Sequence, residues 1–214
     1  MKVVVAGAHG QVAMQLHPLL RGSGIQVRGI IRNPNHAGEV AQAGAEPIVF
    51  DMETDSDFSG AIGDADTIVF AAGGGGPSPA ARKWAVDRDA AIKLMKAGEK
   101  ANVQRFVMLS AISSGKPFPD DEMMNVYAAA KGEADQALRQ SRLPYTIVRP
   151  GPFTNEAATG LVDVAPQLPR RSIPRADVAL VLYNVIIAPG GQRVEFDLTS
   201  GSIPIETAIR NILM

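Results

Sequence analysis

The sequence predicts a doubly wound α/β domain, in which a parallel sheet carries helices on both faces. Short runs rich in Val and Ile are nearly continuous in apolar character, as parallel strands buried on both faces are. Amphipathic stretches alternate with these runs over the first two thirds of the chain, which indicates right-handed crossovers between parallel strands. A glycine-containing turn joins the first run to the first amphipathic stretch.

The elements follow one another in a regular order. Strands are expected at Lys2–Ala6, Gln26–Ile31, 47–50, 67–71, Arg105–Leu109 and 145–148. Helices are expected between them, at 11–21, 37–42, 58–62, 80–101 and 124–140. After a segment rich in Pro and Gly, the chain ends with a helix at 174–187, a strand at 193–198 and a helix at 204–213 that begins at a proline.

We expect the 214 residues to form a single domain. Residues 1–150 would form a cofactor-binding core. Residues 151–214 are too few for an independent domain of common size. They are expected to pack on the sheet edge as a small extension that covers the substrate side.

Composition excludes several classes of partner. The chain has 21 basic and 22 acidic residues, a net charge of -1, so nothing indicates binding to nucleic acid or to an anionic membrane. No apolar stretch approaches the ~18 residues of a membrane span. The first strand begins at Lys2, which leaves no room for a signal peptide, and we expect a cytoplasmic protein.

No metal site is expected. The chain has no cysteine, so thiolate ligands and disulfides are excluded. The three histidines show no metal-ligand spacing with carboxylates. His9 lies inside the glycine turn, where it is expected to touch a ligand, whereas His17 and His36 are expected at the surface.

The glycine turn indicates a dinucleotide site, because it directly follows a strand and opens a helix. Gly7 permits the tight turn, and Gly10 lets the backbone approach a pyrophosphate. Ala13 is small enough for the helix to pack closely on the strand. Gln11 and Val12 open the helix, whose free N–H groups and positive dipole end favour phosphate.

The end of the second strand favours NADP(H) over NAD(H). An NAD-specific site has an acidic residue here for the ribose 2′-hydroxyl, but this strand ends in Arg32 and Asn33. The planar guanidinium of Arg32 suits a 2′-phosphate. Further along the chain, Asp51 and Met52 are expected near the adenine. The small residues Ala71, Ala72 and Gly73 would leave space for the cofactor ribose.

Tyr127 and Lys131 form a candidate acid/base pair. They are four residues apart in an expected helix and therefore share a face. A free phenol has a pKa near 10, and a nearby ammonium lowers that value by favouring the phenolate. Such a pair suits carbonyl–alcohol chemistry beside a nicotinamide.

With these motifs in order, the sequence resembles the short-chain dehydrogenase/reductase family, in its compact, atypical NAD(P)H-binding or epimerase/dehydratase-like branch. The resemblance covers residues 1–160 well and implies a Rossmann-type fold. It implies that Tyr127 is the proton donor and that Lys131 holds the nicotinamide ribose. It also implies that Pro150, Gly151 and Pro152 flank the nicotinamide.

The family's strand-end serine is where this sequence departs from the pattern. In many relatives two serines close the fifth strand and the second is catalytic, but here that place is Ala111. Ser110 or Ser113 is expected to substitute for it, with a slight preference for Ser113. Alternatively, the third catalytic group is missing and the enzyme is slow or inactive.

These observations favour an NADP(H)-dependent oxidoreductase that acts on a small carbonyl, quinone or similar acceptor. The main alternative is a non-catalytic NADP(H)-binding redox sensor, which the Tyr127 and Lys131 pair argues against and Ala111 supports. An epimerase or dehydratase is less favoured, because the C-terminal extension is short. The partner is expected to be a small-molecule substrate, and the protein a monomer or homodimer.

Overall fold

A parallel sheet forms the centre of this computed structural model, which describes residues 1–75, 78–190 and 192–213. Seven strands pair in parallel in the order β3-β2-β1-β4-β5-β6-β10. They are β1 (Lys2–Ala6), β2 (Gln26–Ile31), β3 (Glu46–Val49), β4 (Thr67–Phe70), β5 (Arg105–Leu109), β6 (Tyr145–Pro150) and β10 (Val194–Ser200). The order reverses between β1 and β4, so the predicted doubly wound sheet is confirmed.

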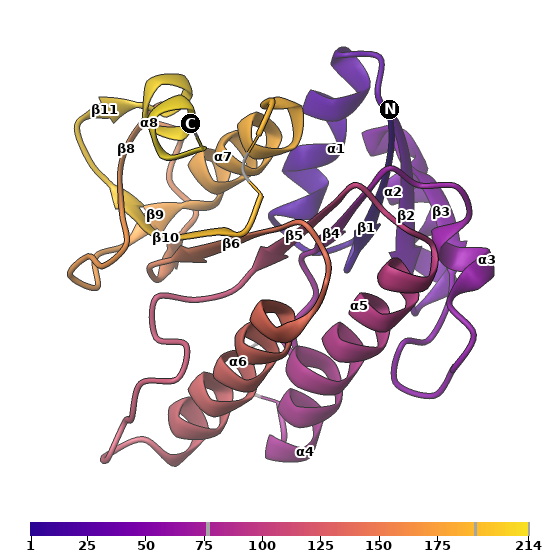
Figure 1. The fold of residues 1–214 in the computed structure, drawn as a ribbon, viewed down its shortest axis with the longest axis horizontal. Helices are drawn as coiled ribbons and strands as arrows, with labels where there is room; N and C mark the ends of the chain where they lie inside the picture. The colour runs from indigo at the N-terminus through magenta and orange to yellow at the C-terminus, as the bar shows by residue number, and fades with distance from the viewer. Residues whose placement is uncertain (76–77, 191, 214) are drawn as a thin grey trace.

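Helices cover both faces of this sheet (Figure 1). One face carries α1 (Ala13–Gly22), α2 (Ala37–Ala43), α7 (Arg175–Ile187) and α8 (Ile205–Leu213). The other carries α3 (Ser59–Ile62), α5 (Ala91–Lys100) and α6 (Glu122–Gln140). Between β2 and α2 the chain forms a short 3₁₀ turn, η1 (Pro34–His36).

The alternation of side chains along β1 explains the two layers. Val3 and Val5 pack with α1 and α7 in one core, while Val4 and Ala6 pack with α5 and α6 in the other. All four are fully buried. Because each buried Val stabilises the fold by about 1.5–3 kcal/mol, both layers hold the central strand in place.

The helix expected at 80–101 is not uniform. It begins as α4 (Ala80–Lys83), continues as a π-helix, η2 (Trp84–Ala90), and ends as α5. A π segment shifts the residues that follow it around the helix axis and is frequent at functional sites. Here it places Asp87 in the protein interior.

The C-terminal extension is part of the sheet itself. β10 pairs in parallel with β6, and β8 (Leu161–Ala165) pairs antiparallel with β10. β11 (Ile203–Pro204) then pairs with β8 at the edge. A separate two-stranded ribbon joins β7 (Phe153–Thr154) and β9 (Ile173–Pro174). The sequence pattern did not predict β8, because Pro and Gly residues surround Leu161–Ala165.

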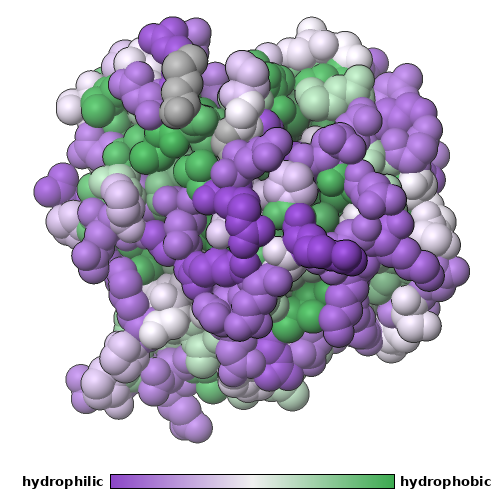
Figure 2. Space-filling view, viewed as in Figure 1, coloured by the Kyte–Doolittle hydropathy of each residue, from purple (hydrophilic) through white to green (hydrophobic). Residues whose placement is uncertain are grey.

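The surface is mixed in character. On the face drawn in Figure 2, hydrophilic residues predominate, and hydrophobic ones gather mainly at the upper left, over α7 and α8. In the part of the chain that the structure describes, no helix is long and apolar enough to cross a membrane. The expectation that His17 lies at the surface is wrong, because this side chain is fully buried on the inner face of α1.

Candidate functional site

The glycine turn lies between β1 and α1, directly against the end of β4. Gly7 has a φ of 79°, and a Cβ built there would lie 2.6 Å from the Ala72 Cα. The Gly10 N–H donates to the Gly7 carbonyl at 2.8 Å, which closes the turn. Only glycine fits at position 7, and its close approach leaves backbone groups facing the crevice above the sheet.

A cavity of about 420 Å³ opens beside this turn. Its walls contain most of the residues predicted to hold the cofactor: Gly7, His9, Gly10, Arg32, Asn33, Asp51, Met52, Ala71, Ala72 and Gly73. Gln11 and Val12 do not line it. The cavity lies at the carboxyl ends of parallel strands where the strand order reverses, as dinucleotide sites do.

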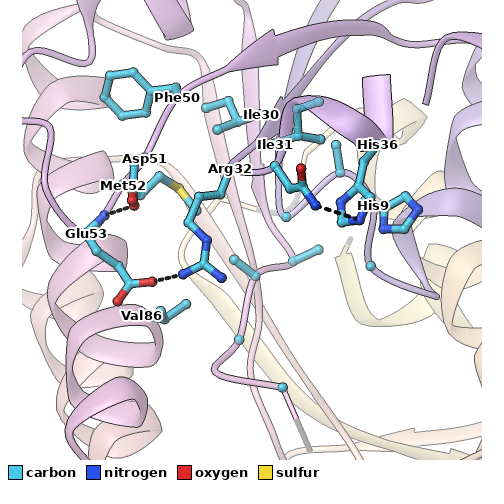
Figure 3. A pocket seen from close by; sticks show the side chains of 18 of the residues that line it. His9, Ile30, Ile31, Arg32, His36, Phe50, Asp51, Met52, Glu53 and Val86 are labelled. Carbon is cyan, nitrogen blue, oxygen red and sulfur yellow. Dashed lines mark hydrogen bonds and ion pairs between the residues drawn. The ribbon is translucent and has the colours of Figure 1, made fainter. Parts of the chain in front are cut away.

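Sequence reasoning missed several residues of this cavity, among them His36, Glu53 and Arg82. The rings of His36 and His9 stack with their centroids 3.6 Å apart, and His9 Nε2 lies 2.9 Å from Glu39 Oε2. Figure 3 draws this histidine pair on one side of the cavity and Glu53 on the other. The short turn η1 begins at a proline and brings His36 back toward the glycine turn. That proline was the sequence signal that could have placed His36 at the cavity.

Arg32 lines the cavity as predicted, but its guanidinium has a protein partner. Its Nη1 donates to Glu53 Oε1 at 2.6 Å. Nη1 of Arg82 lies 3.1 Å from the same oxygen. Two guanidinium groups therefore converge on one carboxylate at the end of the crevice where the second strand stops.

A second cavity, also of about 420 Å³, adjoins the first along Ala71, Ala72 and Gly73. Tyr127, Lys131 and Ser110 all line it. The two cavities form one crevice that runs from the glycine turn to the predicted acid/base pair. A crevice of this form suits an elongated cofactor whose reactive end lies beside Tyr127.

The ammonium of Lys131 is buried and held in place. Its Nζ donates to the Leu109 carbonyl at 3.2 Å and lies 3.2 Å from Asp87 Oδ1. Burial is the largest single influence and would lower the pKa of Lys131, but the interactions with Asp87, Tyr127 and Asp135 together outweigh it and raise the pKa. Lys131 therefore stays positively charged at neutral pH.

Tyr127 remains protonated at neutral pH. Burial raises the pKa of its phenol, and the positive charge of Lys131 offsets this only in part. The net lowering expected from the sequence is therefore wrong for this structure. Asp87, which the sequence analysis did not consider, contributes to the rise. A protonated phenol is the form needed for a proton donor.

The serines near the end of β5 occupy different environments. Ser110 lines the second cavity, and its Oγ donates to Asp135 Oδ2 at 2.8 Å. Ser114 donates to the same oxygen at 2.6 Å. Ser113 and Ala111 are both buried, and neither residue lines either of the two cavities. Geometry therefore favours Ser110 over Ser113.

The segment expected to flank the nicotinamide lies outside the walls of both cavities. Pro150, Gly151 and Pro152 line neither cavity, whereas the next residue, Phe153, lines the second. Gly151 instead packs against the chain of the extension, and a Cβ there would lie 1.7 Å from the Arg171 carbonyl oxygen.

Two buried carboxylates lie at the end of the crevice that contains Tyr127: Asp87 lines the second cavity, and Asp135 accepts from Ser110 behind it. Asp135 continues the spacing of Tyr127 and Lys131 by four more residues, so it shares their helix face. Burial raises the pKa of its carboxyl. Asp87 follows Lys83 by four residues on the buried stripe of its helix. In the sequence, an acidic residue on an otherwise apolar helix face was the signal that would have marked both carboxylates as buried.

The chain resembles known proteins over its whole length. The profile of the NAD(P)H-binding family matches residues 7–189. A relative named as an uncharacterized sugar epimerase, YhfK of Bacillus subtilis, is 34% identical over 214 residues, covering 99% of this chain and 100% of the relative.

Two solved structures share the fold. A Bacillus halodurans protein, named for NAD-dependent epimerases/dehydratases, superposes with a TM-score of 0.93 and 36% identity over 99% of each chain. The oxidoreductase ylbE of Lactococcus lactis gives 0.87 and 28%, covering 100% of this chain and 97% of its own. This chain belongs to the NAD(P)H-binding family, in the atypical, epimerase-like branch of the short-chain dehydrogenases/reductases.

Proposed function

We propose that the protein is an NADP(H)-dependent oxidoreductase that reduces a small carbonyl, quinone or similar acceptor. One observation carries the proposal: Tyr127, Lys131 and Ser110 line a cavity that adjoins the cavity at the glycine turn. An acid/base group and a dinucleotide-binding turn thus share one crevice. The name of the Lactococcus lactis relative, an oxidoreductase, agrees with this reading.

The residues of the second cavity have distinct roles in this proposal. A reduced nicotinamide, when bound, supplies a hydride to the acceptor. Tyr127 donates its phenolic proton to the acceptor oxygen, so that a carbonyl gaining both becomes an alcohol. The charge of Lys131, fixed by Asp87, stabilises the phenolate left behind. The proton is then restored from solvent.

The walls of the second cavity favour a flat, apolar acceptor. Met123, Met124 and Phe153 line it together with Tyr127 and Lys131. Met123 and Phe153 are exposed on the cavity wall, so their apolar side chains are accessible to a ligand. Methionine adapts its shape to different ligands and contacts aromatic rings favourably.

The preference for NADP(H) rests on the charges at the other end of the crevice. Arg32 and Arg82 converge there, and guanidinium groups bind phosphate through paired hydrogen bonds. The strand end carries no acidic residue at position 32 or 33. These features support binding of the 2′-phosphate.

A Tyr127→Phe variant tests the proposal. We would mix the protein with NADPH and a panel of quinones and carbonyls and follow loss of nicotinamide absorbance. We expect turnover to fall by about 10²–10⁴-fold in Tyr127→Phe, with NADPH affinity nearly unchanged. Tyr183→Phe is the control, because Tyr183 bonds Ser23 on the opposite face of the sheet. Unchanged turnover in Tyr127→Phe would contradict the proposed role.

A non-catalytic NADP(H) sensor is the second candidate. The observation that favours it is the bond from Ser110 to Asp135, which uses the hydroxyl proton that would otherwise orient a substrate carbonyl. A sensor would bind NADPH tightly and reduce none of the acceptors. Detectable turnover that depends on Tyr127 would exclude this candidate.

A further inference from the structure

We propose that Glu53 and Arg82 determine cofactor specificity. In this proposal the carboxylate of Glu53 bridges the guanidinium groups of Arg32 and Arg82, and the 2′-phosphate of NADPH takes its place between them. The proposal rests on the NADP(H) dependence proposed above. It adds a second phosphate-binding arginine and a competing carboxylate, neither of which is visible in the sequence motif.

The three side chains come from separate elements and meet at one oxygen atom. Arg32 directly follows β2, Glu53 lies after β3, and Arg82 belongs to α4. Glu53 Oε1 accepts from Arg32 Nη1 at 2.6 Å and lies 3.1 Å from Arg82 Nη1. Figure 3 shows Arg32 and Glu53 pointing toward one another across the cavity. All three residues line that cavity.

The charges of this group suit a phosphate better than a carboxylate. Two guanidinium groups and one carboxylate leave a net charge of +1. The carboxylate offers both arginines the same oxygen, Oε1. A phosphate monoester carries about -1.5 to -2 charges and three acceptor oxygens, so it can serve each guanidinium separately.

Glu53 can turn away without disturbing the backbone. Its N–H donates to Asp51 Oδ1 at 2.9 Å, and its carbonyl accepts from Lys93 Nζ at 2.9 Å. These two bonds fix the main chain on both sides of the residue. Among the residues that the structure describes, its carboxylate forms ion pairs with Arg32 and Arg82 only. Exchange for a phosphate therefore requires rotation of a side chain alone.

Arg82 is already oriented for this role. Its Nε donates to the Gly74 carbonyl at 3.2 Å, which leaves Nη1 directed to Glu53. The Gly74 N–H in turn donates to Asp87 Oδ2 at 2.9 Å. The arginine is thus anchored to Gly74, whose neighbours Gly73 and Gly75 line both cavities. A pre-oriented guanidinium loses little side-chain freedom when it binds an anion.

If Glu53 bound the cofactor ribose instead, its replacement would have the opposite effect on cofactor binding. A carboxylate at the adenosine end of the crevice could instead accept hydrogen bonds from the ribose hydroxyls of NADH and exclude a 2′-phosphate. In that case removal of the Glu53 charge weakens NADH binding. In our proposal the same change strengthens NADPH binding.

The test is a titration of the full-length protein and its variants with NADPH and NADH, read by nicotinamide fluorescence. We expect Glu53→Gln to tighten NADPH binding by about tenfold and Arg82→Gln to weaken it by about tenfold, which are the changes expected from one charge contact. NADH binding should change by less than about twofold in both variants. Glu46→Gln is the matched control, since this glutamate also pairs with an arginine of β2 but lies outside the cavity.

Each result has a definite meaning. Weaker NADH binding in Glu53→Gln, with no gain for NADPH, overturns the proposal and assigns Glu53 to the ribose. A wild-type preference for NADPH that neither variant changes overturns it while the NADP(H) dependence stands. A wild type that prefers NADH overturns both. Thermal melts establish whether the variants fold. If Glu53→Gln does not fold, the NADPH affinity of Arg82→Gln tests the proposal alone.

Discussion

The Nζ of Lys131 lies 3.2 Å from Oδ1 of Asp87, and their side chains are only 4% and 0% exposed. The two residues come from different helical segments, α6 and the π-helix η2. Asp87 also accepts the Gly74 N–H through Oδ2. One buried carboxylate therefore fixes both Lys131 and Gly74, whose neighbours Gly73 and Gly75 line both cavities.

Replacing Asp87 with Asn should destabilise the protein strongly. The amide oxygen of Asn can still accept from Gly74, but the buried Lys131 ammonium loses its ion-pair partner. Breaking one partner of a buried ion pair costs about 3–5 kcal/mol, a large part of the ~5–15 kcal/mol by which proteins are stable. Urea unfolding at neutral pH measures the loss.

Asp89→Asn is the control for this change. Asp89 lies two residues further along the same π-helix and pairs with Arg88 at 2.7 Å, but its side chain is 45% exposed. Exposed ion pairs contribute about 0–1 kcal/mol, so this variant should unfold nearly as the wild type does. Equal losses in the two variants would contradict the structural role of the buried pair.

The glycine turn should not accept even one methyl group at position 7. Gly7→Ala forces a left-handed backbone on a residue with a side chain, which costs about 1–2 kcal/mol. It also drives the Cβ within 2.6 Å of Ala72 Cα. We expect a lower melting temperature and loss of NADPH binding, measured by thermal unfolding and by fluorescence titration.

A glycine elsewhere provides the comparison. Gly38 lies inside α2, and a Cβ there meets nothing within 4 Å. Because alanine favours a helix more than glycine does, Gly38→Ala should stabilise the protein by about 0.5–1 kcal/mol. Its NADPH affinity should equal that of the wild type.

The sequence predicts the fold well because a buried parallel strand leaves a clear pattern. Each of the six strands expected before residue 150 is present, with ends that shift by two residues at most. The glycine turn is equally clear, since its glycines precede α1 directly. β8 was missed because three of its five residues are only partly buried and Pro and Gly surround it.

The contacts around Tyr127 and Lys131 are less predictable, because most of them join residues distant in sequence. Tyr127 and Lys131 are neighbours on one helix, so their spacing suffices. Asp87 reaches Lys131 only through the π-helix, which no local pattern predicts. The choice between Ser110 and Ser113 depends on how the loop after β5 turns toward Asp135, a contact 25 residues away for Ser110.

The junction between β6 and the extension should be equally intolerant of a side chain. A Cβ at Gly151 would lie 1.7 Å from the Arg171 carbonyl oxygen, so Gly151→Ala must push the two segments apart. Overpacking of this kind typically costs about 1–3 kcal/mol. It would also displace Phe153, two residues on, from the second cavity.

Unfolding in urea and acceptor kinetics measure these two effects of Gly151→Ala separately. We expect reduced stability together with a raised KM for the acceptor and an unchanged affinity for NADPH. Gly60→Ala in α3, where a Cβ meets nothing within 4 Å, is the control. A stable Gly151→Ala protein with normal kinetics would show that the junction can relax.

Mild acid should destabilise the protein through His17. Its Nε2 lies 2.8 Å from the Ala8 carbonyl oxygen, so this nitrogen carries the proton. Nδ1 is buried and has no hydrogen-bond partner among the described residues. Protonating it would place an unpaired charge in the core. Burial accordingly lowers the pKa of His17 below its usual 6.5, although the bond to Ala8 opposes this shift.

The sign of the effect follows from proton binding. Because the pKa is lower in the folded state, the unfolded chain binds the proton first as the pH falls. The contribution of His17 is therefore complete above about pH 6.5 and is lost as the pH falls toward the folded-state pKa, by at most about 1.4 kcal/mol per pH unit. Asp135, whose pKa is raised by burial, acts in the opposite direction in acid.

Comparing the wild type with His17→Gln separates the effect of His17 on stability from that of Asp135, because Asp135 is present in both proteins. The free energy of unfolding, measured in urea from pH 5 to pH 8, should fall more steeply below pH 6.5 in the wild type than in His17→Gln. His36→Gln, which changes a half-buried histidine of the cofactor crevice, should keep the steep fall. Parallel profiles for the wild type and His17→Gln would mean that His17 accepts its proton in the folded protein as readily as in the unfolded chain, against the geometry at Ala8.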